Sequence, residues 1–210
     1  PGGLFATESL CLPDLTIRNK PDNTIYQETA ILARVDCPDG LKAPTGFSPL
    51  GGERRVAHFG LEAGLRWPTA PAEWLKELAA KITRDKRLKL QFVTPAVFDG
   101  GWLPGWLQGL EGQIPGTNVR VKLISAAIPR RMGFSGWDYA YVDSKTQRRG
   151  QPKKARFAVP DGSVFFLEVQ SKAVNAECLS KLWLGGACDC SRDNNDGFGL
   201  VLPGVWDYAK

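Results

Sequence analysis

The stretch Ile128-Pro-Arg-Arg-Met-Gly-Phe-Ser-Gly-Trp-Asp138 opens the part of the chain, residues 128–168, around which the rest is arranged. A basic segment without acidic residues follows, and the sequence then becomes apolar and β-prone again up to Glu168. The basic residues of this segment are Lys145, Arg148, Arg149, Lys153, Lys154 and Arg156, and the aromatic residues just before it are Phe134, Trp137, Tyr139 and Tyr141. Cations beside aromatic rings suit a phosphate backbone with unstacked bases. A long solvated hairpin loop is the alternative interpretation, because charge runs often only face water.

The positive charge of this protein is concentrated in one place. The 210 residues carry a formal net charge of +5 and the sequence pI is about 9.0. The segment from Lys145 to Arg156 accounts for the whole excess, and the remainder is near neutral. A local basic patch of this kind favours an anionic partner such as RNA.

The cysteines and the hydropathy indicate the compartment. The five cysteines are odd in number and irregularly spaced, at Cys11, Cys37, Cys178, Cys188 and Cys190. We therefore expect reduced thiols in a cytoplasmic protein. No signal peptide is visible in residues 1–10, and no apolar run approaches the roughly 18–20 residues that span a membrane. Neither a membrane nor a cofactor is expected as a partner, and the initial Pro1 indicates a piece of a longer or processed protein.

Periodicity predicts an α+β protein. A helix is predicted over 71–86, with Pro71 at its first position and Trp74, Leu75, Leu78, Ala79 and Ile82 on one apolar face. A shorter helix is predicted around 173–184. The predicted strands are 24–35, 88–94, 118–125 and 163–169, with a glycine-rich loop leading into a further strand within 196–206. This order predicts a ferredoxin-like (RAMP/RRM-like) unit with an antiparallel or mixed sheet and large loop insertions.

The residues that could carry chemistry are few. The single histidine, His58, is a candidate general base, although a lone histidine in a β-prone run is usually structural. Cys178, Cys188 and Cys190 are close in sequence, but their spacing fits a four-ligand zinc site poorly, so no metal is predicted. Gly197-Phe-Gly199 could cradle a phosphate or form a tight strand entry. Asp189, Asp193 and Asp196 lie near each other as candidate carboxylates, and their pattern fits a polar turn equally well.

Five motifs in order carry a family resemblance. They are Leu50-Gly-Gly-Glu-Arg-Arg55; Thr94-Pro-Ala-Val-Phe98 with Trp102 and Pro104; Gly133-Phe-Ser-Gly-Trp-Asp138; Ala158-Val-Pro-Asp-Gly-Ser-Val-Phe-Phe166; and Gly197-Phe-Gly-Leu-Val-Leu-Pro-Gly-Val-Trp206. Together they resemble the third subunit of the Cmr complex, the type III-B CRISPR–Cas effector, a member of the RAMP superfamily. The resemblance covers nearly the whole chain. It implies that residues 1–210 form a single C-terminal RAMP region, with insertions at about 95–117 and 138–157, and that the family's N-terminal ferredoxin-like domain is absent.

The resemblance also implies a function and a set of site residues. It implies a non-catalytic subunit that anchors the 5′ repeat tag of the guide RNA in antiviral defence. The implied protein partners are the large polymerase/nuclease-like subunit and backbone RAMP subunits. The residues expected to contact RNA are Gly51, Gly52, Arg54, Arg55, Arg130, Arg131, Gly133, Trp137, Arg148, Arg149, Lys153, Lys154, Arg156, Gly197 and Gly199.

Two other functions remain open at this stage. A precursor-RNA endonuclease of the same superfamily would use His58 near an RNA groove. A protein-docking module without its own RNA site would use the aromatic-rich loop from Trp102 to Trp106 as an exposed patch.

Overall fold

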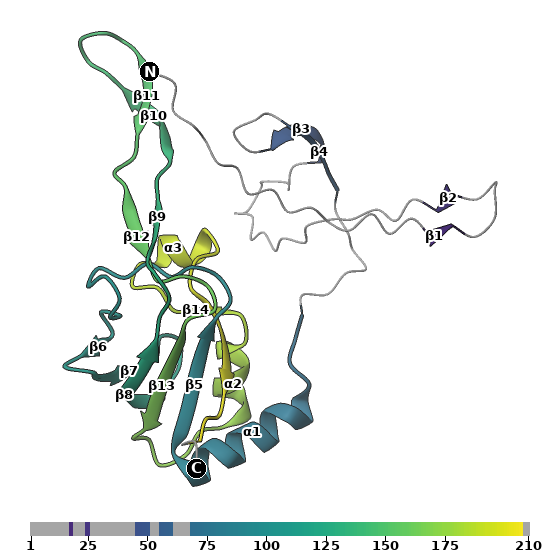
Figure 1. Ribbon diagram of the computed structural model, residues 1–210, viewed down its shortest axis with the longest axis vertical. Helices are drawn as coiled ribbons and strands as arrows, with labels where there is room; N and C mark the ends of the chain where they lie inside the picture. Colours follow the sequence, from purple (N-terminus) through teal and green to yellow (C-terminus); the bar gives the residue numbers. More distant parts are fainter. Residues whose placement is uncertain (1–16, 19–23, 26–44, 51–54, 61–67, 208–210) are drawn as a thin grey trace. The chain divides into compact units, whose positions relative to one another are not determined.

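The computed structural model describes residues 17–18, 24–25, 45–50, 55–60 and 68–207, and the chain divides into two compact units, 1–67 and 68–210. In the first unit two antiparallel strand pairs are described (Figure 1). β1 (Ile17–Arg18) pairs with β2 (Thr24–Ile25), and β3 (Gly46–Leu50) pairs with β4 (Arg55–Phe59). Most of the strand predicted over 24–35 lies outside the described residues.

The second unit contains an antiparallel sheet of seven strands in the order β14-β15-β5-β13-β8-β7-β6. Its strands are β5 (Arg87–Phe92), β6 (Leu107–Gln108), β7 (Glu111–Gln113), β8 (Arg120–Ala127), β13 (Val164–Val169), β14 (Gly185–Gly186) and β15 (Leu200–Gly204). Every neighbouring pair in it is antiparallel. The predicted α+β class is confirmed, and the predicted strands 88–94, 118–125 and 163–169 correspond to β5, β8 and β13.

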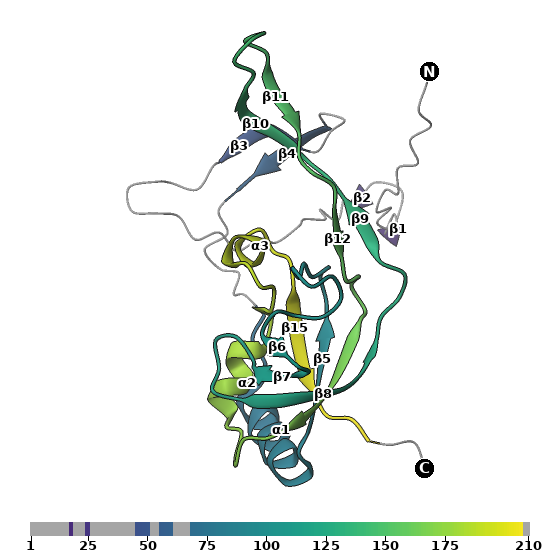
Figure 2. The ribbon, with the colours of Figure 1, turned by 90° about the vertical axis from the view of Figure 1, so that its left-hand side faces the viewer.

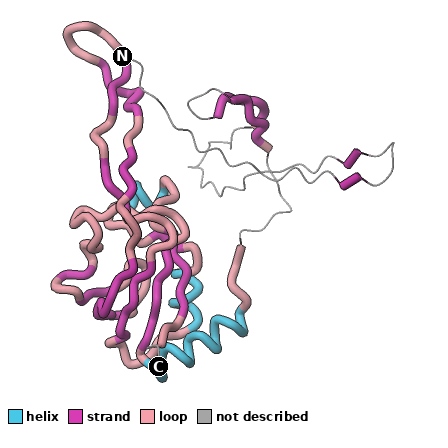
Figure 3. Tube along the Cα trace, in the orientation of Figure 1, coloured by secondary structure: helices cyan, strands magenta, loops and turns pink. Residues whose placement is uncertain are grey.

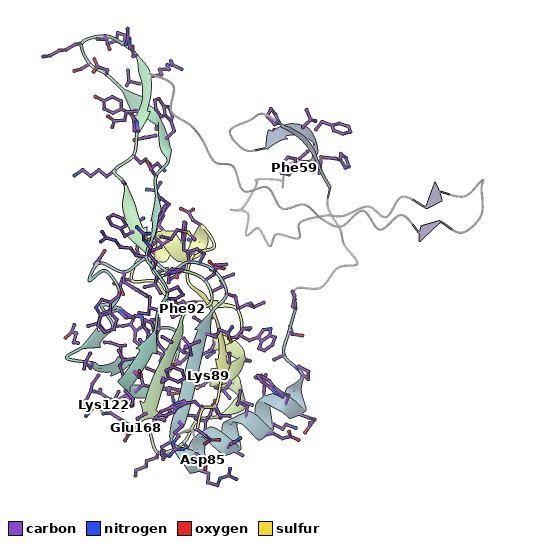
Figure 4. The ribbon with its side chains drawn as sticks, viewed as in Figure 1. Phe59, Asp85, Lys89, Phe92, Lys122 and Glu168 are labelled. Carbon is purple, nitrogen blue, oxygen red and sulfur yellow. The ribbon has the colours of Figure 1, made fainter. Side chains whose placement is uncertain are left out.

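The core lies on one face of this sheet, because side chains alternate along each strand. Leu88, Leu90 and Phe92 of β5 are fully buried, while Gln91 is exposed. Phe92 (Figure 4) and Phe165 of β13 meet edge to face, with ring centroids 5.1 Å apart. The alternation read from the sequence therefore identifies the buried face correctly.

Two helices cover this face (Figure 2). In α1 (Ala72–Asp85) the predicted apolar face is buried, apart from Trp74, which is 39% exposed. Pro71 lies one position earlier than predicted, at the N-cap. α2 (Ala176–Leu182) begins with Asn175, whose side chain accepts a hydrogen bond from the backbone N–H of Cys178. The two helices pack together, and Thr83 exchanges hydrogen bonds with the backbone of Val174.

The first crossover of the sheet differs from the ferredoxin-like expectation. In a β-α-β-β-α-β unit a helix joins the first two strands. Here the connection from β5 to β8, residues 93–119, contains no helix and instead adds the short hairpin β6–β7 to the sheet edge. The helix α1 precedes β5 in the chain. The ferredoxin-like fold is therefore not confirmed, although four strands lie in the order β15-β5-β13-β8 with α2 between β13 and β15.

A long two-stranded ribbon interrupts the chain between β8 and β13. It consists of β9 (Met132–Phe134), β10 (Trp137–Val142), β11 (Arg149–Pro152) and β12 (Arg156–Ala158), paired as β9–β12 and β10–β11. We call residues 130–158 the arm. Figures 1 and 3 show that it runs out beyond the end of the sheet. The insertion predicted at about 138–157 is only partly a loop: Arg149–Pro152 is a strand, because the chain pairs back on residues 137–142 as a hairpin.

Candidate nucleic-acid interface

The base of the arm is held by an ion pair that the sequence did not predict. The guanidinium of Arg156 donates two hydrogen bonds, each 2.7 Å long, to the carboxylate of Asp193. Asp193 lies in α3 (Ser191–Asn195), where a polar turn was expected, and its side chain is only 6% exposed. A bidentate pair of this kind fixes both position and orientation. Arg156, predicted as an RNA contact, is therefore engaged within the protein.

Aromatic packing reinforces the same junction. The ring of Phe134 stacks on Phe198 at a centroid distance of 5.0 Å, and the Arg156 guanidinium lies 5.7 Å from the Phe134 ring. Hydrogen bonding by Arg156 lowers the pKa of the Asp193 carboxyl, and the same bond raises the pKa of Arg156. Both groups are thus charged at neutral pH, and the arm is attached to α3 and the following loop by a salt bridge and a stacked ring pair.

The glycine loop next to this junction has its backbone donors in use. The N–H of Gly197 donates to the carbonyl of Asn194 at 3.1 Å, and the N–H of Gly199 donates to Pro95 at 2.8 Å. Gly199 has a φ of +71° and its Cα faces Cys188, so a side chain there would meet the Cys188 sulfur. The geometry corresponds to the tight strand entry rather than to a phosphate cradle, which needs unoccupied N–H groups.

Most of the predicted basic residues lie exposed along the arm, whose side chains Figure 4 draws. These exposed residues are Arg130, Arg131, Lys145, Arg148, Arg149, Lys153 and Lys154. Within the part of the chain that the structure describes, none of them forms an ion pair with a carboxylate. The arm thus presents cations whose charge is not neutralised by the described part of the protein.

The tip of the arm is ordered by one of its two acidic residues. The carboxylate of Asp143 accepts hydrogen bonds from the backbone N–H groups of Lys145 and Thr146, at 2.9 and 2.6 Å. These bonds lower the pKa of Asp143, the bond from Thr146 contributing most. The side chain closes an Asx-type turn. Asp143 therefore shapes the tip that carries Lys145 and Arg148.

The predicted stacking residue Trp137 lies on the surface of the ribbon. Its side chain is 47% exposed, and across the strands it faces Pro152. Gly150 lies against its indole: the backbone there has a φ of +82°, and a Cβ would collide with the indole nitrogen. Gly150 therefore makes room for the ring, whereas a Cβ at the predicted Gly133 would lie 3.5 Å from the Phe157 ring, an ordinary van der Waals contact.

Several predicted residues belong to the first unit. Gly51, Gly52 and Arg54 lie outside the described residues, and Arg55 begins β4. His58 is exposed in β4, with its ring 4.9 Å from that of Phe47 across the β3–β4 pair. No acid or base partner of His58 is present among the residues that the structure describes. The ring contact accounts for its position without a catalytic role.

The loop predicted as an aromatic docking patch is only partly exposed. Trp102 is 49% exposed, but Pro104 is buried. The indole of Trp106 donates to the carbonyl of Ala187 at 3.0 Å and packs against the core. Trp102 alone therefore remains as an exposed aromatic contact in this loop.

The three C-terminal cysteines lie in different surroundings, and two of them are buried. Cys178 donates to the side-chain oxygen of Asn118 at 2.9 Å, and the sulfur of Cys188 accepts the N–H of Val97 at 3.3 Å. Cys190 is exposed. In the described ranges no group of three or more possible metal ligands is present, and no helix there is long and apolar enough to cross a membrane.

Cysteine reactivity provides a first test of this arrangement. Burial raises the pKa of the Cys188 thiol to about 11, so it is neutral at physiological pH. Because the thiolate is the reactive form, we expect iodoacetamide to modify Cys190 much faster than Cys188 in the native protein, as measured by peptide mass spectrometry over time. Denatured protein, in which the two rates should converge, is the control. Equally fast modification of both in the native protein would contradict the burial of Cys188.

These observations describe an α+β protein with an antiparallel sheet and a projecting arm whose charge suits a polyanionic partner. A family model described as "CRISPR-associated protein (Cas_Cmr3)" matches residues 2–206, so the chain belongs to this family, the Cmr3 subunits of the type III-B CRISPR–Cas complex. The resemblance found in the sequence is thereby confirmed, and the chain is a subunit of a CRISPR effector complex. No curated protein that was compared matches it.

Proposed function

We propose that this subunit is non-catalytic and holds the 5′ repeat-derived tag of the guide RNA along its arm, while other surfaces dock onto the large polymerase/nuclease-like subunit and the backbone subunits. The observation that carries this proposal is the set of exposed arm cations that have no carboxylate partner within the described residues. In a subunit of a CRISPR effector, the polyanion with which such cations are expected to pair is the guide RNA.

The arm residues divide into roles by their chemistry. Arg130, Arg148 and Arg149 present planar guanidinium groups that can each donate two hydrogen bonds to one phosphate. Lys153 and Lys154 add attraction that does not depend on sequence. Trp137 offers an exposed indole to an unpaired base. Arg156 is left out of this assignment because its charge is paired with Asp193, and Gly197 and Gly199 are left out because their N–H groups are bound within the protein.

The proposal extends to the fold and to the protein contacts. We assign β15-β5-β13-β8 with α2 to a RAMP-type, ferredoxin-like unit, in which residues 95–117 replace the first crossover helix and the arm is an insertion. The strand order and the all-antiparallel pairing support this assignment. Trp102, as an exposed aromatic on the 95–117 loop, is the residue that we assign to protein docking.

The test is a fluorescence-anisotropy titration of the full chain with a single-stranded RNA that carries the 5′ repeat tag, and with a scrambled RNA of equal length, each at two salt concentrations. We expect tighter binding to the tag RNA, with this preference lost in the Arg130→Ala/Arg131→Ala protein. Equal, salt-sensitive binding to both RNAs would overturn tag recognition by this chain. No binding at either salt concentration would overturn the whole RNA-binding proposal.

The endonuclease alternative is tested with the same preparations. We expect no cleavage of precursor CRISPR RNA by either the wild-type or the His58→Ala protein, because the described surroundings of His58 supply only the Phe47 ring. If the wild-type protein cleaves the RNA and the His58→Ala protein does not, His58 has a catalytic role and not a structural one.

A further inference from the structure

A second aromatic side chain of the arm is exposed and was not predicted to bind RNA. Phe157 in β12 is 50% exposed. Its partner across the β9–β12 pair is Gly133, which has no side chain to cover the ring. The edge of the ring lies beside the Gly133 backbone, since a Cβ there would be 3.5 Å from Cε1. Half of this apolar side chain is thus exposed in the middle of a strand, where such a side chain is usually covered.

An arginine is stacked on this ring. The guanidinium carbon of Arg131 lies 4.0 Å from the centroid of Phe157, well within the range of a cation–π contact. In the described part of the chain Arg131 pairs with no carboxylate. Its N–H groups therefore remain available at the edge of the stack. This distinguishes Arg131 from Arg156, whose charge is paired with Asp193 through two hydrogen bonds.

A nucleotide fits both parts of this pair. Unpaired bases stack on aromatic rings and on guanidinium planes, and the phosphate accepts hydrogen bonds from the guanidinium edge. We propose that Phe157 and Arg131 form a second stacking platform, which takes one unpaired nucleobase of a single-stranded RNA together with a neighbouring phosphate. This inference rests on the proposed function and adds a site to the one at Trp137.

The spacing of the two platforms indicates what kind of RNA they hold. Gly133, opposite Phe157, and Trp137 are four residues apart along the chain, with Ser135 and Gly136 between the β9–β12 and β10–β11 pairs. At roughly 3.3 Å per residue the chain spans up to about 13 Å between the two platforms. Bases within a nucleic-acid helix are only about 3.4 Å apart. A strand that uses both platforms therefore has splayed bases, so a single-stranded segment is held and a duplex is not.

The proposal is tested with a single-stranded RNA that carries the 5′ tag and contains 2-aminopurine, whose fluorescence is quenched on stacking. We expect Phe157→Leu to weaken binding about tenfold and to remove the quenching at one probe position. We expect Phe157→Tyr to stay close to wild type, because it keeps the ring. Neither change removes a charge, so the dependence of affinity on salt should not change. Trp74→Leu, which removes an exposed aromatic on α1 outside the arm, is the matched control.

Two further measurements keep the test decisive. Arg131→Lys keeps the charge and loses the planar guanidinium, so we expect weaker binding with an unchanged salt slope. Circular dichroism and thermal melting show whether the Phe157→Leu protein is folded. If it is not folded, the Arg131→Lys protein serves as the test variant in its place. If the wild-type protein binds the RNA and neither substitution weakens this binding, the platform is overturned and the proposed function stays intact. A wild-type protein that does not bind the RNA would overturn the proposed function itself.

Discussion

Replacing Asp193 with asparagine is expected to lower the free energy of unfolding by about 2 kcal/mol and to loosen the arm. The substitution keeps the shape of the side chain but removes the charge that Arg156 contacts through two hydrogen bonds. Hydrogen bonds to charged groups contribute roughly 1.5–3 kcal/mol. The Arg156 side chain is 43% exposed, so water screens part of the attraction and the lower half of this range applies.

Two measurements check this prediction. Urea unfolding gives the loss of stability, and hydrogen exchange compares the amides of the arm with those of β5 and β13. We expect faster exchange in the arm and unchanged protection in the central strands. Asp196→Asn is the control, because Asp196 is an exposed carboxylate next to α3. Arm protection that survives Asp193→Asn would show that the stacked rings of Phe134 and Phe198 hold the arm by themselves.

The same pair predicts how the arm responds to pH. The pKa of Asp193 is lower in the folded chain than in the unfolded chain, chiefly because Arg156 donates to the carboxylate. The stabilisation is therefore present above the ordinary aspartate pKa and is lost as the pH falls through the lowered one. We expect the arm to stay attached at neutral pH and to loosen only below about pH 4. Loosening near neutral pH would point to a group other than Asp193.

Neutralising the outer arm is expected to have the largest effect on RNA affinity. The substitutions are Arg148→Gln, Arg149→Gln, Lys153→Gln and Lys154→Gln in one protein. Each phosphate neutralised on a single strand contributes about 0.7 to the slope of log affinity against log salt. Loss of all these contacts should reduce the slope by about 3 and the affinity near 0.1 M salt by roughly three orders of magnitude.

The control for this experiment removes the same amount of charge from another surface. Lys76, Lys81, Lys172 and Lys181 are exposed lysines on or next to the two helices. Replacing these four lysines with glutamine lowers the net charge by the same amount as the arm substitutions. The control protein should therefore show only the effect of overall charge on RNA affinity. A similar loss of affinity in both proteins would mean that the RNA is attracted by the whole molecule and not by the arm.

Local patterns in the sequence predicted the regular elements well. Apolar residues recur at regular short intervals in α1, β5, β8 and β13. Because such a pattern involves only residues close together in the chain, it can be recognised from the sequence alone. The basic segment was also apparent, because charge is a property of composition. The family was identified from short motifs in order, and the match over residues 2–206 confirmed it.

Sequence patterns alone could not assign roles to individual site residues. Arg148 and Arg156 are equally basic in the sequence and both are exposed, yet among the described residues only Arg156 is paired with a carboxylate, that of Asp193. Trp102 and Trp106 are equally aromatic, yet only Trp106 donates to a core carbonyl. The signal that could have identified the anchor was weak, because Asp193 resembles any turn aspartate until its partner is known.

The sequence by itself determined the family, the α+β class and the location of the positive charge, since these follow from motifs, from short-range periodicity and from composition. Only the tertiary structure decided which cations remain available, which glycine N–H groups are occupied and how the crossover from β5 to β8 is made. The physical reason is the separation of the partners along the chain. Arg156 and Asp193 are 37 residues apart and Gly199 and Pro95 far more, so each pairing exists only after the sheet has brought its two segments together.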